Sequence, residues 1–143
     1  MEIPTPKVGL VIRYSFLWSR QAQEAQEEGS KDRPAAIIVK TDKSGGNTTV
    51  WVCPITHHPD PDDDIVEVPE RTRNELGLDN EKQWLVANEI NRFLWPGFDL
   101  RPIPGTNECV YGMLPKHLFE QIRSRVQKLV QDRSPNLSTP WRG

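Results

Sequence analysis

The chain of 143 residues carries a formal net charge of −2, and its 36% hydrophobic and 27% charged fractions are those of an ordinary globular domain. No apolar run approaches the ~20 residues that a membrane-spanning helix needs, and the first residues lack the basic region of a signal peptide, so we expect a cytoplasmic protein with no membrane contact. Asp and Glu outnumber Lys and Arg by nine to three within residues 59–83, so the acidity is confined to one segment and a basic groove can exist elsewhere.

The N-terminal third of the chain predicts three strands. Residues 8–14 are rich in β-branched and aromatic side chains, as strands are. Residues 34–40 and 49–55 are two further apolar runs, and the Gly-rich sequence between them, 44–47, predicts that they pair as a β-hairpin. The polar residues 21–29 predict a mobile loop that leads into this hairpin.

The middle of the chain predicts a loop, a strand and a short helix. Residues 59–64 are rich in Pro and Asp, which pair poorly in a sheet, so they predict a surface loop. Residues 65–68 predict a short strand that ends at Pro69. A helix is expected over 69–76, because proline is favoured at the first helical position and Gly77 follows the last one.

The C-terminal half completes a mainly β fold. Residues 84–90 and 109–114 predict two more strands. Residues 116–131 place apolar side chains on one stripe and cations over the rest, so they predict an amphipathic helix. Residues 132–143, rich in Ser and Pro, predict a flexible tail after a single domain over 1–131. Short strands broken by Pro and Gly, with one terminal helix, predict a small, strongly bent β-barrel.

Polar side chains of the predicted hairpin meet at one end of the sheet. Arg33 enters the first strand, Thr56 leaves its antiparallel neighbour, and His57 and His58 follow directly. A guanidinium grips phosphate oxygens through two hydrogen bonds, and an imidazole moves protons near neutral pH, so this end is a candidate phosphodiester site. Because consecutive residues of an extended chain point to opposite faces, only one of the histidines can share a face with Arg33.

Each of these side chains also has a purely structural interpretation. Arg33 can pair with Asp32 or another surface acid, and Thr56 can simply end a strand. The histidines and the aspartates of 60–64 can form a metal site, although carboxylates on a Pro-rich loop more often belong to a solvated acidic surface. Walker A, GxGxxG, GxSxG and HExxH motifs do not occur, which removes most nucleotide-binding, hydrolase and metalloprotease functions.

A second polar group, Glu89 and Asn91, stands just before the sequence Trp95-Pro96-Gly97. An exposed tryptophan can stack on a nucleic-acid base, whereas a buried one belongs to the core. The two polar residues therefore either bind a ligand or cap a turn through side-chain hydrogen bonds.

Several segments, taken in order, resemble the MazF/PemK-like toxins of type II toxin–antitoxin modules. The resemblance to the family as a whole is carried by 9–12 (GLVI), 31–34 (KDRP) and 54–56 (PIT). The divergent PemK-like branch looks closer still, through 14–18 (YSFLW), 76–79 (LGLD), 89–101 (EINRFLWPGFDLR) and 111–115 (YGMLP). The resemblance covers about residues 8–130.

This resemblance implies a dimeric, SH3-like β-barrel with a C-terminal helix that acts as a sequence-specific endoribonuclease without a metal or other cofactor. In the family, the ribose 2′-hydroxyl attacks the adjacent phosphorus and leaves a cyclic phosphate. By resemblance, Arg33 matches the catalytic arginine and Thr56 the catalytic threonine. The reaction needs both charge stabilisation and proton movement, and His57 is our candidate for proton transfer because it is the closer of the two histidines in sequence.

The resemblance also implies binding residues and partners. The expected partners are single-stranded RNA, an acidic antitoxin whose extended segment lies in the Arg33 groove, and a second copy of the chain, because open sheet edges tend to pair. The chain departs from compact family members by a long acidic loop before Arg33 and by acidic material in 59–101. These features leave open a non-catalytic binding or regulatory module with the toxin fold. The candidates for RNA binding are Lys31, His58, Glu89, Asn91 and Trp95.

Overall fold

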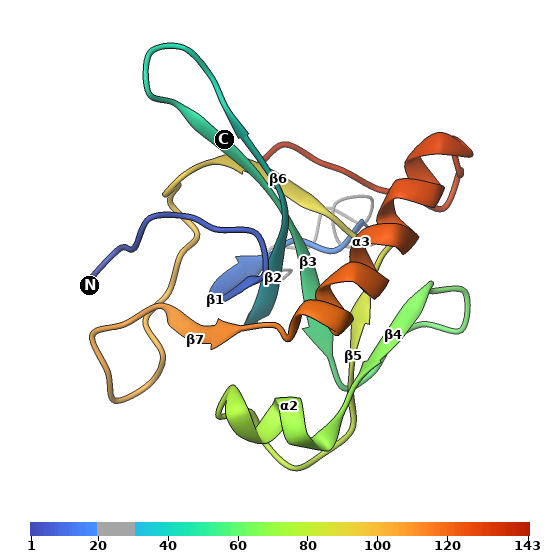
Figure 1. Ribbon diagram of the computed structural model, residues 1–143, viewed down its shortest axis with the longest axis horizontal. Helices are drawn as coiled ribbons and strands as arrows, with labels where there is room; N and C mark the ends of the chain where they lie inside the picture. The colour runs from blue at the N-terminus through green and yellow to red at the C-terminus, as the bar shows by residue number, and fades with distance from the viewer. Residues whose placement is uncertain (20–30) are drawn as a thin grey trace.

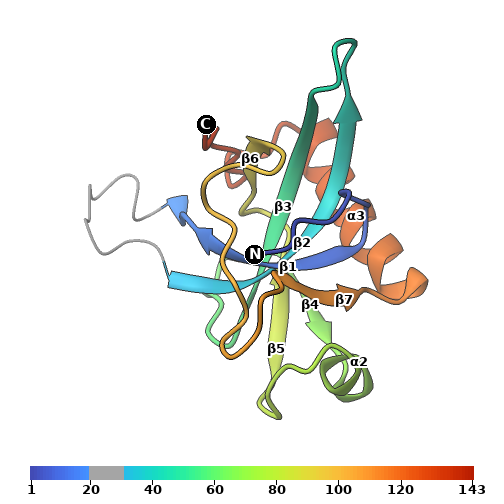
Figure 2. The ribbon, with the colours of Figure 1, turned by 90° about the vertical axis from the view of Figure 1, so that its left-hand side faces the viewer.

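The computed structural model describes residues 1–19 and 31–143, and within them an antiparallel sheet curls into a half-barrel beside a C-terminal helix (Figures 1 and 2). The sheet order is β4-β5-β3-β2-β1-β7, with β6 paired to β3. The mainly β fold with a C-terminal helix is therefore confirmed. The elements are β1 Leu10–Phe16, β2 Lys31–Asp42, β3 Thr48–Thr56, β4 Ile65–Val68, α2 Glu70–Glu75, β5 Gln83–Val86, β6 Asn91–Leu94, β7 Val110–Met113 and α3 Lys116–Gln131.

The predicted hairpin is confirmed as β2 and β3, which form the long central ribbon at the top of Figure 1. Its ladder runs from the pair Ala35–Pro54 to the pair Asp42–Thr48, and Lys43 N donates to Asn47 O at 2.8 Å to close the turn. β2 begins at Lys31, before the expected residue 34, because its first residues pair with the end of β1. The expected loop over 21–29 lies outside the described residues.

The first strand begins two residues later than expected. Gly9 has a φ of +88°, a conformation that glycine adopts without steric cost, so residues 8 and 9 form a turn instead of extending the strand. Gly9 N donates to Ile37 O at 2.7 Å, and this bond holds the turn against β2. β1 then continues to Phe16, and it pairs with β2 over this length.

Strand alternation gives the sheet two buried faces. Along β1, Val11 packs on one face, whereas Ile12, Tyr14 and Phe16 pack on the other. The first face is covered by α3, which buries Leu118, Ile122 and Val126 along one stripe as the sequence predicts. The opposite face holds a second core that is rich in aromatic rings. The sheet is therefore a shared wall between two apolar clusters.

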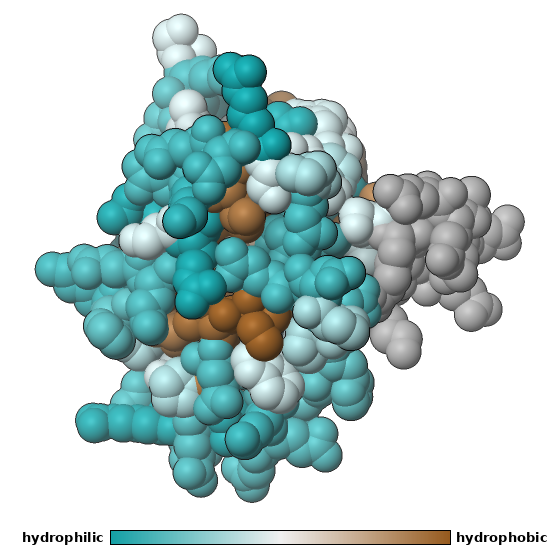
Figure 3. Space-filling view, turned by 90° about the vertical axis from the view of Figure 1, so that its right-hand side faces the viewer, coloured by the Kyte–Doolittle hydropathy of each residue, from teal (hydrophilic) through white to brown (hydrophobic). Residues whose placement is uncertain are grey.

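The outer side of the molecule near α3 is polar. The face seen in Figure 3 is mostly hydrophilic, with apolar side chains reaching the surface only near its middle. Arg125 of α3 pairs with Asp64 through Nη1 and Oδ1 at 2.6 Å, so a cation of the helix reaches the loop before β4. The loop over 59–64, the strand over 65–68 and the short helix α2 all occur where the sequence predicts them.

The single strand predicted over 84–90 is wrong. The chain instead forms β5, turns at Ala87 and Asn88, and enters the separate strand β6. The side chain of Asn88 causes the break: its Oδ1 accepts from Asp64 N at 2.7 Å and its Nδ2 donates to Asp63 Oδ1 at 2.9 Å. Propensity alone does not reveal this turn, because the flanking residues all favour strands.

The C-terminal tail lies along β6 instead of extending freely as expected. Ser138 and Pro140 accept main-chain hydrogen bonds from Ile90 and Arg92 at 2.9 and 3.0 Å, and Arg142 N donates back to Arg92 O at 2.7 Å. The side chain of Arg142 reaches inward to Asn91 Oδ1 at 3.0 Å. In Figure 1 the tail crosses from the end of α3 to β6.

Candidate functional site

The register of the hairpin brings Arg33 and Thr56 to the same end of the sheet, as predicted. Ala35 pairs with Pro54, so two more steps along each strand reach Arg33 and Thr56, and equal offsets keep both side chains on one face. β3 leaves β2 at this point, because Thr56 pairs with Trp84 of β5. The start of β2 and the end of β3 therefore diverge (Figure 2), and we call this end of the hairpin, opposite its turn, the mouth of the hairpin.

Arg33 stacks on an aromatic ring at this mouth. Its guanidinium carbon lies 5.0 Å from the centroid of the Trp18 ring, within the ~6 Å of a cation–π contact. Trp18 is almost fully buried, whereas Arg33 is partly buried. Tyr14 of β1 lies directly across the ladder from Arg33. The Trp18 ring thus fixes the direction of a cation at the end of the strand.

Asp32, the acid next to Arg33 in sequence, lies beside a different arginine. Arg101 Nε is 3.8 Å from Asp32 Oδ1. Strand alternation explains this, because Asp32 and Arg33 point to opposite faces of β2. Lys31 is the first residue of β2, and its side chain lies outside the described part of the structure.

Thr56 keeps one hydrogen-bonding function unused. Its side chain is 6% exposed, and its Oγ1 accepts from His58 N at 3.2 Å, which turns the chain out of β3. The hydroxyl proton is donated to no residue of the described chain. Thr56 therefore retains a hydroxyl proton that it can donate, although the residue is almost fully buried.

His57 is held by a carboxylate that sequence reasoning did not identify. Its Nε2 lies 2.8 and 3.0 Å from the two oxygens of Asp79, on the loop after α2. Asp79 is itself fixed by hydrogen bonds from Glu81 N and Gln83 Nε2 at 3.0 and 3.1 Å. The hydrogen bond from His57 lowers the pKa of Asp79 below its ordinary value. The pair leaves Nδ1 of His57 for proton transfer.

The acids near the histidines separate into two groups. Two aspartates of the 59–64 loop are used within the fold: Asp63 accepts from Asn88 and Asp64 pairs with Arg125. His57, Asp79 and Glu81 instead place three donor atoms within 4.8 Å of one another, the one such cluster found in residues 1–19 and 31–143. A divalent cation could be held by these three residues, rather than by the loop aspartates that the sequence suggests.

His58 lies beside His57 without sharing its partner. The two ring centroids are 6.1 Å apart, and the ring planes are tilted by 47°. The structure therefore brings His57 to Asp79 and places His58 next to the turn after Thr56.

Glu89 and Asn91 are components of the buried framework. Asn91 is fully buried, and its side chain accepts from Leu17 N and donates to Leu17 O, both at 2.9 Å. Glu89 accepts from Ser19 N and Ser19 Oγ at 2.8 and 2.6 Å. These bonds fix the chain on either side of Trp18, so the two residues act on Arg33 through the ring on which it stacks.

Trp95 is used as a structural residue as well. Its Nε1 donates to Pro4 O at 3.0 Å, and its ring packs beside Phe93 with a centroid separation of 6.3 Å. It ties the N-terminal segment to the end of β6.

Sequence reasoning missed three residues of this neighbourhood: Trp18, Asp79 and Arg142. Trp18 follows an aromatic-rich strand and looks like ordinary core. Asp79 starts the alternation Asp79-x-Glu81-x-Gln83, in which Glu81 donates to Asp79 through its main-chain N–H and Gln83 through its side chain. That spacing is the one signal that could have marked Asp79. Arg142 lies in a segment that the sequence predicts to be flexible, and no local pattern predicts its contacts.

Comparisons with known proteins add no assignment. No protein-family model matches the chain, and a search of curated proteins finds no match. The resemblance to MazF/PemK-like toxins therefore rests on the motifs and their order. Among the described residues, no helix is long and apolar enough to cross a membrane.

Proposed function

We propose that the chain is a metal-independent, sequence-specific endoribonuclease that cleaves single-stranded RNA, and that it is the toxin of a type II toxin–antitoxin module. The observation that carries the proposal is the stack of Arg33 on Trp18 at the mouth of the hairpin, with Thr56 at the same end. An oriented guanidinium at the same end of the hairpin as a hydroxyl donor suits the binding of a phosphodiester.

The proposed reaction uses no metal or other cofactor. The ribose 2′-hydroxyl attacks the adjacent phosphorus, the P–O5′ bond breaks, and the products are a cyclic phosphate and a 5′-hydroxyl. Arg33 stabilises the charge on the non-bridging oxygens, and Thr56 donates a hydrogen bond to one of them. His57 accepts the proton of the 2′-hydroxyl or donates a proton to the leaving 5′-oxygen through Nδ1, and solvent water carries the other proton. Asp79 holds the ring of His57 in place through Nε2.

The partners follow from the same proposal. The chain would act in the cytoplasm, on messenger RNA, as a homodimer that pairs its open sheet edges. An acidic antitoxin would inhibit it by placing an extended segment over Arg33. Sedimentation at micromolar concentration that gives a monomer would contradict the dimer.

Cleavage of total RNA in excess chelator tests this function. The purified chain is expected to cut RNA at a defined sequence in the presence of EDTA, to leave cyclic phosphate ends, and to arrest growth when expressed alone. Intact RNA at high enzyme concentration, together with normal growth, would reject the proposal. Loss of cleavage on adding chelator would instead point to the cluster of His57, Asp79 and Glu81 as a metal site.

A second candidate function is a non-catalytic module that binds RNA or protein. It is favoured by the burial of Thr56 and by the structural use of Glu89 and Asn91, which leaves fewer groups for the reaction than the sequence suggests. Binding of RNA without any cleavage would distinguish this module from the nuclease.

A further inference from the structure

A second cationic site lies at the opposite end of the hairpin from Arg33. An open hollow of about 370 Å³ is formed where the hairpin turn, β6 and the C-terminal tail meet, in the upper part of Figure 1. We call it the distal pocket. β2 extends at about 3.3 Å per residue, so the pocket lies roughly 30 Å from Arg33 along the sheet. Its lining includes Lys43, Asn47, Thr49, Arg92 and Trp141.

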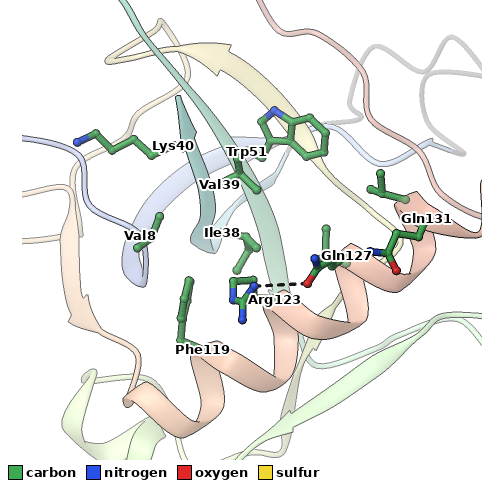
Figure 4. Close-up of a pocket in the computed structure, with 11 residues that line it drawn as sticks. Val8, Ile38, Val39, Lys40, Trp51, Phe119, Arg123, Gln127 and Gln131 are labelled. Carbon is green, nitrogen blue, oxygen red and sulfur yellow. Dashed lines mark hydrogen bonds between the residues drawn. The ribbon is translucent and has the colours of Figure 1, made fainter. Parts of the chain in front are cut away.

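Two aromatic rings orient the arginine of this pocket. The guanidinium carbon of Arg92 lies 5.9 Å from the centroid of the Trp51 ring and 6.0 Å from that of the Trp141 ring. Arg92 Nε donates to Thr139 O at 2.7 Å, which fixes the remaining nitrogens in direction. Trp51 also stands at the edge of the apolar groove beside α3, on the far side of Val39 from Phe119 (Figure 4).

Within the described part of the chain, the cations of the distal pocket have no acidic partner. Neither Lys43 nor Arg92 forms an ion pair with any described residue, and no Asp or Glu is among the lining residues. Asp42, the nearest acid in sequence, points to the other face of β2 by strand alternation and accepts from Thr48 Oγ1 at 2.7 Å. Two uncompensated cations that share one hollow create a local positive potential on an otherwise acidic protein.

An exposed ring completes the pocket. Trp141 is 47% exposed although its main-chain neighbours are bonded to β6. Thr49 and Asn47 add neutral hydrogen-bonding groups from the hairpin. A flat aromatic face beside unpaired cations is the combination that binds single-stranded nucleic acid, because bases stack on the ring while phosphates contact the cations.

We propose that the distal pocket binds one nucleotide of single-stranded RNA, with its base on Trp141 and its phosphate at Lys43 and Arg92. The proposal rests on RNA being the ligand of the proposed function, and it adds a binding subsite remote from Arg33. Its role is to hold a long RNA on the protein. The RNA cut at Arg33 would then be anchored at both ends of the hairpin.

Binding of an RNA that cannot be cut tests the pocket separately from cleavage. The probe is a fluorescent 2′-O-methyl oligouridylate of about 20 nucleotides, longer than the sites of most single-strand-binding folds, and it lacks the attacking hydroxyl. We expect Trp141→Ala to weaken binding about 5- to 100-fold. Lys43→Glu should weaken it and reduce the slope of log affinity against log salt by about 1. Fluorescence anisotropy of the full chain measures both effects.

Matched variants separate stacking from folding and from general charge. Trp141→Phe retains a ring and should bind within about 3-fold of wild type. Lys82→Glu makes the same charge change at an exposed site outside the pocket, and it should bind like wild type. If Trp141→Phe binds as weakly as Trp141→Ala, the ring does not act by stacking and the proposal is overturned. Wild-type binding by Trp141→Ala or Lys43→Glu also overturns it.

A competition arm separates RNA from an acidic peptide. A polyglutamate peptide that binds more tightly than the oligouridylate, and whose binding does not change in Trp141→Ala, would show a site that recognises charge alone and would contradict the nucleotide. The experiments can reject the pocket proposal and the nuclease proposal separately. Cleavage that persists in variants with unchanged RNA binding rejects only the pocket, whereas pocket-dependent binding without cleavage rejects only the nuclease.

Discussion

Two regions of the molecule place polar side chains among aromatic rings, and they use those side chains differently. Around Asn91, the side chain is fully buried and its amide is bonded to both main-chain groups of Leu17 and to Arg142. At the mouth of the hairpin, Arg33 is only partly buried on Trp18, and Thr56 still has a hydroxyl proton to donate. The polar groups around Asn91 stabilise the fold, whereas those at the mouth of the hairpin can still bind a ligand.

The difference shows why residue type alone is a poor guide to function. Asn91 and Arg33 are both polar, yet a buried amide left without partners would cost free energy, so the fold must satisfy it internally. A side chain at a strand end has no such requirement. The predictions below test whether the two regions separate in this way.

The largest stability effect is expected at Asn91. Asn91→Ala removes three hydrogen bonds and leaves the partly buried N–H and C=O of Leu17 without their partner. The free energy of unfolding should fall by about 2–4 kcal/mol. Denaturant unfolding followed by tryptophan fluorescence measures this change.

The control for this experiment is an asparagine outside the network. Asn74 is exposed on α2, and Asn74→Ala should change the free energy of unfolding by no more than about 0.5 kcal/mol. If Asn91→Ala instead lost RNA binding while its stability stayed at the wild-type value, Asn91 would belong to the binding surface that the sequence suggests.

A smaller effect of opposite sign is expected at Tyr14, which faces the same core as Phe93. Its ring stacks on Phe93 with a centroid separation of 4.8 Å, and its hydroxyl is buried without a hydrogen-bond partner among the described residues. Burial also raises the pKa of this phenol. Tyr14→Phe keeps the stack and removes the unsatisfied hydroxyl, so it should stabilise the fold by about 1 kcal/mol. A destabilised Tyr14→Phe variant would mean that the hydroxyl has a partner.

The smallest effect depends on pH and concerns the pair of His57 and Asp79. The pKa of Asp79 in the folded chain is lower than its ordinary value. Ionised Asp79 therefore stabilises the folded state fully above pH ~3.9, and this stabilisation is lost as the pH falls through the folded pKa. The pair is largely exposed, so its effect is small. Near pH 6, the free energy of unfolding of wild type should exceed that of Asp79→Asn by about 0.5 kcal/mol.

Unfolding measured from pH 6 to pH 2 should show this gap closing below pH ~3.9. A gap that widens on acidification would contradict the proposed origin of the effect.

Much of the fold is predictable because local patterns and tertiary packing agree. The stripe of Leu118, Ile122 and Val126 predicts α3 and is the stripe that α3 buries. The Gly-rich turn between two apolar runs likewise predicts the hairpin, and with it the common end of Arg33 and Thr56. These features depend on short-range periodicity, which is visible in the sequence.

The parts that were not predicted depend on contacts between distant residues. Asn88 breaks the expected strand because Asp63 and Asp64 reach it from 24 or more residues earlier. The tail is fixed in part because Arg142 donates a hydrogen bond to the buried Asn91. The partner of His57 could not be deduced either, since Asp79 lies 22 residues away on another loop. No local pattern encodes such pairings.

Single-turnover cleavage by Arg33 variants tests the central claim most directly. With a mapped RNA in excess chelator, Arg33→Ala should cut about 10²- to 10³-fold more slowly than wild type, while the free energy of unfolding falls by no more than about 1 kcal/mol. Arg33→Lys should recover only part of the rate because it lacks the bidentate fork. Arg71→Ala, which removes an arginine that is 91% exposed on α2, should cut like wild type. Cleavage by Arg33→Ala at the wild-type rate would contradict the account.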